Sequence, residues 1–130
     1  MMTTDINKLS SKVIGAAIEV HKHLGPGLLE SAYEECLCHE LGLRDTSLER
    51  QKALPIIYKG KELDCGYRLD VVVDKQLIVE LKSIEKIMPI HKAQLLTYLK
   101  LSDVRLGLIL NFNVTMMKEG IVRVVNDLSE

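Results

Sequence analysis

The segment YRLDVVVDKQLIVELK, residues 67–82, decides the fold of this chain of 130 residues. Two stretches rich in β-branched residues, 69–73 and 77–81, flank a polar break at residues 74–76, which is the pattern of a β-hairpin. Successive side chains of a strand point to opposite faces of the sheet, and both faces of this hairpin are largely apolar. We therefore expect the hairpin in the middle of a sheet that is covered on both sides.

The alternation assigns the residues of the hairpin to two faces. One face is predicted to hold Leu69, Val71, Val73, Leu77, Val79 and Leu81. The opposite face is predicted to hold Asp70, Val72, Ile78, Glu80 and Lys82. A slip of one residue in the pairing would exchange the two faces, so the residues that share a face depend on the register.

Three charged residues stand on the second face. With the turn centred on Lys75, Asp70 lies opposite Glu80, with the two Cβ atoms about 5 Å apart. Two such carboxylates repel each other, but they become favourable together around a divalent cation, and a hard ion such as magnesium prefers carboxylate oxygens. Lys82 points the same way and could place its ammonium beside the ion. A cross-strand ion pair of Lys82 with Asp70 or Glu80 explains the spacing equally well.

Length and composition indicate one domain, residues 1–130. Hydrophobic residues make up 47% of the chain and charged residues 27%, and no apolar run approaches the about 20 residues that a membrane helix needs. The first residues, MMTTDINK, lack the features of a signal peptide, and three cysteines, an odd number, fit a reducing compartment. A cytoplasmic location is expected.

The net charge of −1 argues against a protein that coats nucleic acid through bulk charge. A local basic rim around the acidic pair would still suffice to contact one phosphodiester. The candidates for that rim are Arg68, Lys82, Lys86, Lys92 and Lys100. Each of them, taken singly, is equally well explained as solvated surface.

Apolar spacing predicts helices over residues 5–23, 28–41 and 90–101, and strands over residues 48–58, 105–112 and 121–125. Pro55 interrupts the first of these strands, and residues 59–61 are expected to turn from it into the central hairpin. The predicted order is two helices, three antiparallel strands, a helix and two strands.

Two pairs of helical residues are candidates for function. Glu30 and Tyr33 share one face at the start of the second helix, and Gln94 and Tyr98 share one face of the third. A glutamate in a first turn is usually a partner of the helix dipole, and the second pair is equally consistent with a partly hydrated helix edge. On the third helix the core face is expected to hold Ala93, Leu96 and Leu99.

This order, with Asp70 and the sequence Glu80-Leu81-Lys82 on the central strands, resembles the PD-(D/E)xK nuclease superfamily. The resemblance implies an α/β, restriction-endonuclease-like core, in which helices flank a mixed central sheet that contains an antiparallel three-strand meander. The stretch GLLESAY, residues 27–33, fits the motif of the GxxExxY family, and nearly the whole chain follows that family's pattern. The proline of the superfamily motif is missing, because Leu69 precedes Asp70.

The resemblance also implies the chemistry of the site. It implies a magnesium-dependent nuclease, with manganese as a substitute, whose substrate is nucleic acid and DNA rather than RNA. The implied metal ligands are Asp70, Glu80, the backbone carbonyl of Leu81, and Glu30. Lys82 joins the three carboxylates as a catalytic residue. Gln94 and Tyr98 resemble the QxxxY element of RecB-like nucleases, and together with Tyr33 they are the expected substrate-binding residues.

Two other functions remain open from the sequence. The fold could serve as a non-catalytic module that binds nucleic acid or protein, which the small size and near-neutral charge favour. A phosphodiesterase acting on a small nucleotide would require a closed pocket. Because so small a domain has little surface for selecting a substrate, a protein partner or a homo-oligomer also stays open.

Overall fold

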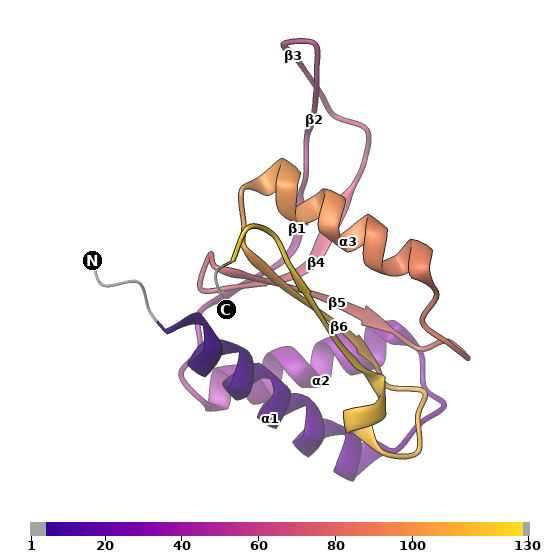
Figure 1. The fold of residues 1–130 in the computed structure, drawn as a ribbon. Helices are drawn as coiled ribbons and strands as arrows, with labels where there is room; N and C mark the ends of the chain where they lie inside the picture. Colours follow the sequence, from indigo (N-terminus) through magenta and orange to yellow (C-terminus); the bar gives the residue numbers. More distant parts are fainter. Residues whose placement is uncertain (1–4, 129–130) are drawn as a thin grey trace.

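The computed structural model describes residues 5–128, which form a three-layered body with a projecting arm, residues 54–67 (Figure 1). Residues 1–4, the start of the segment in which no signal peptide is expected, and residues 129–130 lie outside the described residues. The helices are α1 (Ile6–Leu24), α2 (Glu30–Leu43) and α3 (Pro89–Ser102), with a 3₁₀ turn η1 (Met117–Gly120). The strands are β1 (Leu48–Ala53), β2 (Ile56–Tyr58), β3 (Lys61–Leu63), β4 (Arg68–Val73), β5 (Leu77–Lys82), β6 (Leu106–Asn111) and β7 (Ile121–Val125).

Five strands form the central sheet in the order β1-β4-β5-β6-β7. β5 and β6 run parallel and are joined through α3, whereas the other neighbours are antiparallel. In Figure 1, α1 and α2 cover one face of the sheet and α3 covers the other. The mixed α/β class and the antiparallel meander of β1, β4 and β5 are confirmed, and the architecture is consistent with a restriction-endonuclease-like core. No helix in the described part of the chain has the length and apolar character to cross a membrane.

The sheet separates two hydrophobic clusters. The larger one packs α1 and α2 against Val71, Val73, Leu77, Val79 and Leu81. The smaller one packs α3 against Leu69, Val72, Ile78 and Ile109. The central strands are therefore covered on both sides, because two different helical layers each bury one face of the same sheet.

Leu69 corrects the predicted alternation, because it joins Val72 in the cluster under α3 instead of lying with Val71. The cause is an irregularity at Asp70. The ladder between β1 and β4 pairs Arg50 with Val71 and Lys52 with Leu69, but it contains no pair between them. Gln51, which stands at the missing step, has a positive φ of 49°. Such a local break resets the alternation of the strand.

The predicted strand over residues 48–58 is also corrected. It divides at residues 54–55 into β1 and β2, because Pro55 cannot donate to a ladder. The turn that follows does not lead into the central hairpin but joins β2 to β3 as a separate two-stranded sheet. Lys59 and Gly60 both have positive φ, 49° and 81°, as a two-residue hairpin turn requires.

On α3 the buried residues are Leu95, Tyr98 and Leu99, whereas Ala93 is exposed and Leu96 is only partly buried. The expectation is confirmed for Leu99 and wrong for Ala93 and Leu96, because Leu95 and Tyr98 take the other places in the smaller cluster.

Candidate active site

The centre of the candidate site lies where β4 and β5 stop pairing through their backbones. The ladder pairs Val71 with Val79 and Val72 with Ile78, so the predicted register is confirmed. At the next two residues, Asp70 and Glu80, side-chain carboxylates accept the hydrogen bonds of the backbone N–H groups. Glu80 Oε2 accepts a hydrogen bond of 3.0 Å from the backbone N–H of Asp70, and Asp70 Oδ2 accepts one of 2.9 Å from that of Leu81. Each carboxylate therefore reaches across to the opposite strand.

Burial makes the charge of these two carboxylates costly. Glu80 is only 9% exposed, and its burial, together with the neighbouring charge of Asp70, raises its pKa to about 8. Burial also raises the pKa of Asp70, although the hydrogen bond from Leu81 opposes this effect and the charges of Glu34 and Glu30 add to it. A buried and a half-buried carboxylate that share one end of a strand pair form a site where positive charge is needed.

Lys82 lies at the end of β5, two residues beyond Glu80, and is half-buried. Its charge lowers the pKa of Glu80, opposing the effects of burial and of Asp70. Among residues 5–128, however, the ammonium of Lys82 forms no salt bridge with either carboxylate. The simple cross-strand ion pair is thus not formed here, and the ammonium is left for another anion.

The strand end that carries Lys82 is fixed by Asn111, which the sequence analysis did not single out. β5 and β6 pair Lys82 with Asn111, and the backbone N–H of Phe112 donates to the carbonyl of Lys82. The buried Asn111 amide accepts from the N–H of Ile84 and donates to its carbonyl, at 3.1 and 3.0 Å. A polar residue at the end of an apolar strand was the signal that could have identified it.

Glu30 reaches the same region through the loop that precedes α2. The hydroxyl of Ser83, next to Lys82, donates to the carbonyl of Leu28 at 2.6 Å. The hydroxyl of Tyr33 donates to the carbonyl of Gly25 at 2.6 Å and accepts from the N–H of Leu28 at 3.1 Å. These bonds tie the loop to the end of β5, so Glu30, the first residue of α2, is held close enough to raise the pKa of both buried carboxylates.

Tyr33 itself corrects an expectation. Its side chain has no exposed surface and stacks on Phe112 with the ring centroids 4.4 Å apart. A fully buried ring cannot contact a substrate, so Tyr33 holds the loop and supports the site from within the core.

A second polar group that sequence reasoning missed lies beside Asp70. The buried Glu34 accepts hydrogen bonds from Arg50 at 2.9 Å and from Gln51 at 2.8 Å. Glu34 follows Glu30 by four residues, so the helical spacing alone would have put the two on one face. This network supplies the positive charge that allows Glu34 to remain buried behind the site.

Gln94 and Tyr98 lie on the α3 side of the site. Both line an open hollow of about 430 Å³ between α3 and the base of the arm, together with Ile56, Cys65, Tyr67, Thr97 and Leu101. Burial raises the pKa of Tyr98, and the charge of Glu80 contributes. The expected neighbours on one helix face thus line one hollow.

The donor set suits a hard divalent cation only in part. Oxygen ligands and mutual carboxylate repulsion at Asp70 and Glu80 fit such an ion. Within residues 5–128, however, no three side chains of His, Cys, Asp or Glu are gathered closely enough to hold a metal. Glu30, the third carboxylate of the implied ligand set, is exposed.

Comparison with known proteins gives one match. The family model described as the PD-(D/E)XK nuclease superfamily matches residues 7–124 and so spans both helical layers and the whole sheet up to Val124. No curated protein and no solved structure matches the chain.

Proposed function

The chain belongs to the PD-(D/E)XK nuclease superfamily, and from this premise we propose that it is a metal-dependent nuclease that hydrolyses phosphodiester bonds of nucleic acid, DNA rather than RNA. The observation that carries the proposal is the pair of carboxylates, the buried Glu80 and the half-buried Asp70, which face each other beside an ammonium without a salt bridge. We further propose that residues 1–130 act as one nuclease-like domain.

The branch of the superfamily is part of the proposal. The GxxExxY motif at residues 27–33 has a physical basis in this chain, because Gly27 has a φ of 100° and the hydroxyl of Tyr33 bonds the loop around it. This supports membership of the GxxExxY family. The shared hollow of Gln94 and Tyr98 supports kinship with the RecB-like nucleases.

The proposed ligands of magnesium, or of manganese in its place, are Asp70, Glu80 and the backbone carbonyl of Leu81. Glu30 would complete the set directly or through water, since it stands at the start of α2 beside the pair. When bound, such an ion lowers the pKa of a coordinated water and offsets charge on the phosphate. The bonds of Ser83 and Tyr33 fix the loop that precedes Glu30.

The remaining residues act on the substrate. Lys82 would place positive charge where negative charge develops at the scissile phosphate, which is a large term in catalysis when the charge is held in position beforehand. Asn111 fixes the strand end that carries this lysine. Gln94 and Tyr98 would hold the backbone of the nucleic acid from the side of α3.

The test is a calorimetric titration of manganese and of magnesium into the wild type and into Asp70→Asn. The asparagine keeps an oxygen acceptor for the N–H of Leu81 but removes the charge, so we expect metal binding to weaken at least about tenfold. The matched control is Asp74→Asn, in the exposed turn at the other end of the same hairpin. Equal binding by all three proteins would refute the assignment of the metal site.

A second candidate is a non-catalytic binding module with the same fold. The observation in its favour is that the described residues contain no group of three metal-binding side chains. The same titration separates the two functions. If the wild type binds neither ion, even with an oligonucleotide present, the non-catalytic module becomes the better account.

A further inference from the structure

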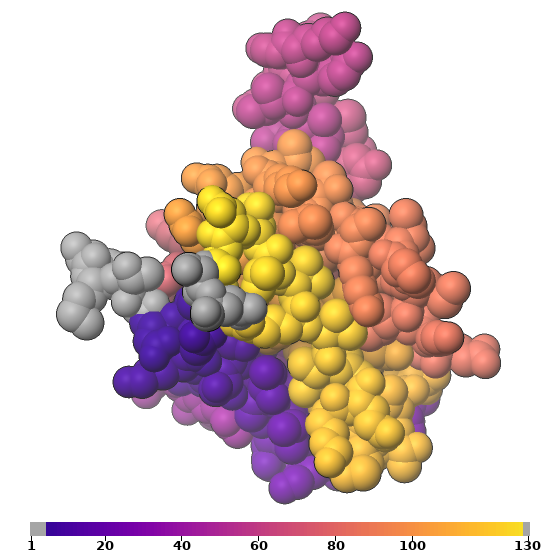
Figure 2. All heavy atoms as spheres, in the orientation of Figure 1, coloured from indigo at the N-terminus to yellow at the C-terminus, as the bar shows by residue number. Residues whose placement is uncertain are grey.

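The arm formed by residues 54–67, which contains β2 and β3, is not used by the proposed chemistry. It stands clear of the body in both overall views (Figures 1 and 2). Its base is fixed, because Leu54 is buried in the smaller cluster and its N–H donates to the carbonyl of Tyr67 at 3.0 Å. A two-stranded hairpin is seldom stable without such an anchor.

The arm exposes large apolar and aromatic side chains. Ile57 is 60% exposed, Tyr58 is 62% exposed and Tyr67 is 44% exposed. Single exposed apolar residues are ordinary, but here they share one small element with little core of its own. Aromatic rings in this setting are surfaces on which bases of a single strand can stack.

The tip of the arm carries two lysines, although Glu62 and Asp64 follow them and make the arm neutral overall. Lys59 lies in the turn and Lys61 directly follows it, and neither forms a salt bridge among the described residues. Lys59 lies 5.4 Å from the centroid of the Tyr58 ring, so a cation and a stacking surface are side by side. Phosphates and bases of one strand present the matching pair of groups.

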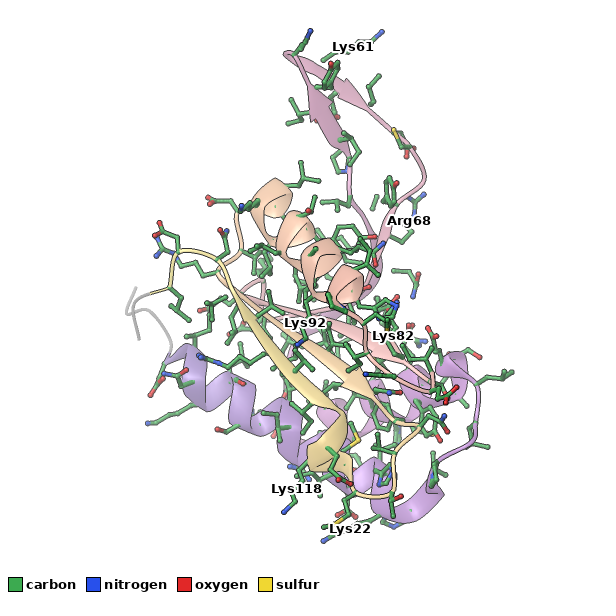
Figure 3. The ribbon with its side chains drawn as sticks, turned by 45° about the vertical axis from the view of Figure 1, so that its right-hand side comes forward. Lys22, Lys61, Arg68, Lys82, Lys92 and Lys118 are labelled. Atoms are coloured by element: carbon green, nitrogen blue, oxygen red, sulfur yellow. The ribbon has the colours of Figure 1, made fainter. Side chains whose placement is uncertain are left out.

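The arm is also continuous with the candidate site. Its base residues Ile56 and Tyr67 line the hollow that Gln94 and Tyr98 share, and the rings of Tyr67 and Tyr98 lie 6.1 Å apart. In Figure 3, Lys61 at the tip, Arg68 at the base and Lys82 follow one another down the right-hand side, whereas Lys22 and Lys118 lie at the opposite end.

We propose that the arm is a binding surface for single-stranded nucleic acid, in which Tyr58 and Tyr67 stack on bases while Lys59 and Lys61 contact phosphates. A strand held in this way would run through the hollow toward Asp70 and Glu80. The inference rests on the proposed function, since nucleic acid is the substrate of that site. It adds that the substrate is single-stranded where it meets the arm.

The test measures binding by fluorescence anisotropy, with a labelled oligothymidylate of about 16 nucleotides. The probe is used alone and annealed to its complement, in EDTA so that no metal-dependent cleavage occurs. The variants are Tyr58→Ala, with Tyr58→Phe to keep a ring, and the double variant Lys59→Ala/Lys61→Ala. The matched control is Lys22→Ala/Lys118→Ala, which removes two lysines at the far end of the molecule.

We expect Tyr58→Ala to weaken binding of the single strand about tenfold and Tyr58→Phe to preserve it, because stacking needs only the ring. The double lysine variant should reduce the slope of log K against log salt concentration by about 1.4, the value for two phosphate contacts on a single strand. The control should change neither quantity. A labelled oligouridylate with the same dependence on Tyr58 also supports the proposal, because stacking is indifferent to the sugar.

Several results would overturn it: no binding by the wild type, binding unaffected by Tyr58→Ala, or equal loss of binding for the duplex. Sedimentation that shows a wild-type dimer and a monomeric Tyr58→Ala would make the arm an interface between copies instead. Failure of the metal titration while Tyr58→Ala loses affinity would refute the nuclease and leave the arm proposal standing. Metal binding by the wild type together with unchanged affinity of Tyr58→Ala for the single strand would refute the arm proposal and leave the nuclease proposal standing.

Discussion

The ionisation of Glu80 is coupled to the stability of the metal-free protein. Its pKa is about 8 in the folded chain against 4.5 for an ordinary glutamate, because burial and Asp70 disfavour its charge. Between these two pH values the folded state therefore binds more protons than the unfolded state, and stability falls as the pH rises through this window. Above about pH 8 the loss is complete.

Glu80→Gln should remove this loss, since the amide oxygen can still accept from the N–H of Asp70. We expect the melting temperature of the variant to exceed that of the metal-free wild type by several degrees at pH 8.5 and to converge with it near pH 4, given about 1.4 kcal/mol for each pKa unit. Thermal unfolding in EDTA across this pH range measures the difference. Glu85→Gln, an exposed carboxylate, is the control. A variant less stable than the wild type at alkaline pH would contradict the prediction.

Lys82 and Asp70 should separate metal binding from cleavage. Lys82→Ala removes a positive charge and no proposed ligand, so we expect it to bind manganese as the wild type does but to lose about 10²–10³-fold in cleavage rate. Asp70→Asn should lose both. Calorimetry combined with a gel assay on mixed DNA substrates measures the two effects. Cleavage retained by Lys82→Ala would contradict this division of roles.

Among the secondary-structure elements, the end of β6 is the one whose contacts position the loop after Lys82. Gly120, the last residue of η1, packs against the end of this strand, and a Cβ added there would overlap the backbone carbonyl oxygen of Asn111. The same Asn111 fixes the loop that follows Lys82. A small residue in η1 therefore packs against the strand end that positions Lys82, the proposed catalytic lysine.

Gly120→Ala should accordingly destabilise the protein by about 1–3 kcal/mol or more, because backbone atoms must move. Gly42→Ala is the matched control, since an added Cβ there meets nothing within 4 Å, and in a helix alanine is preferred to glycine by about 1 kcal/mol. Urea unfolding of both variants gives the two free energies. Equal stability of Gly120→Ala and the wild type would show that η1 can shift freely.

At the scale of the whole molecule, the arm and the body are built differently. The body buries two clusters on either side of one sheet, whereas β2 and β3 contribute no member of either cluster. The pairs of Lys52 with Leu69 and Ala53 with Arg68 already join β1 to β4 below the arm. The body should therefore fold without it.

Replacement of residues 56–63 by a short Gly-Ser linker should change the free energy of unfolding by less than about 1 kcal/mol, because the cost of closing a loop varies slowly with its length. Urea unfolding should remain a single transition, and metal binding should be unchanged. Loss of several kcal/mol would mean that the arm stabilises the hollow beside α3 and is part of the fold. The shortened chain also provides an independent control for the binding experiment on the arm.

The helices and the register of the central hairpin could be predicted from the sequence alone. Apolar spacing located all three helices of the described residues to within about two residues, and the polar break at residues 74–76 placed Asp70 opposite Glu80. These features are local, because a helix or a hairpin is specified by periodicity and turn residues within its own length. The resemblance to the superfamily likewise rested on motifs readable in order along the chain, and the family match confirms it.

Only the tertiary structure decided which polar groups meet. It buried Tyr33 against Phe112, brought Ser83 to Leu28 across 55 residues, and linked Glu34 to Arg50 and Gln51. It also formed the separate sheet of β2 and β3, where the sequence predicted the end of one strand and a turn. Such contacts depend on how the layers pack, and the spacing of residues along one element carries no information about distances between elements. The burial that raises the pKa of Glu80 arises in the same way, from helices placed over the sheet by residues far away in the sequence.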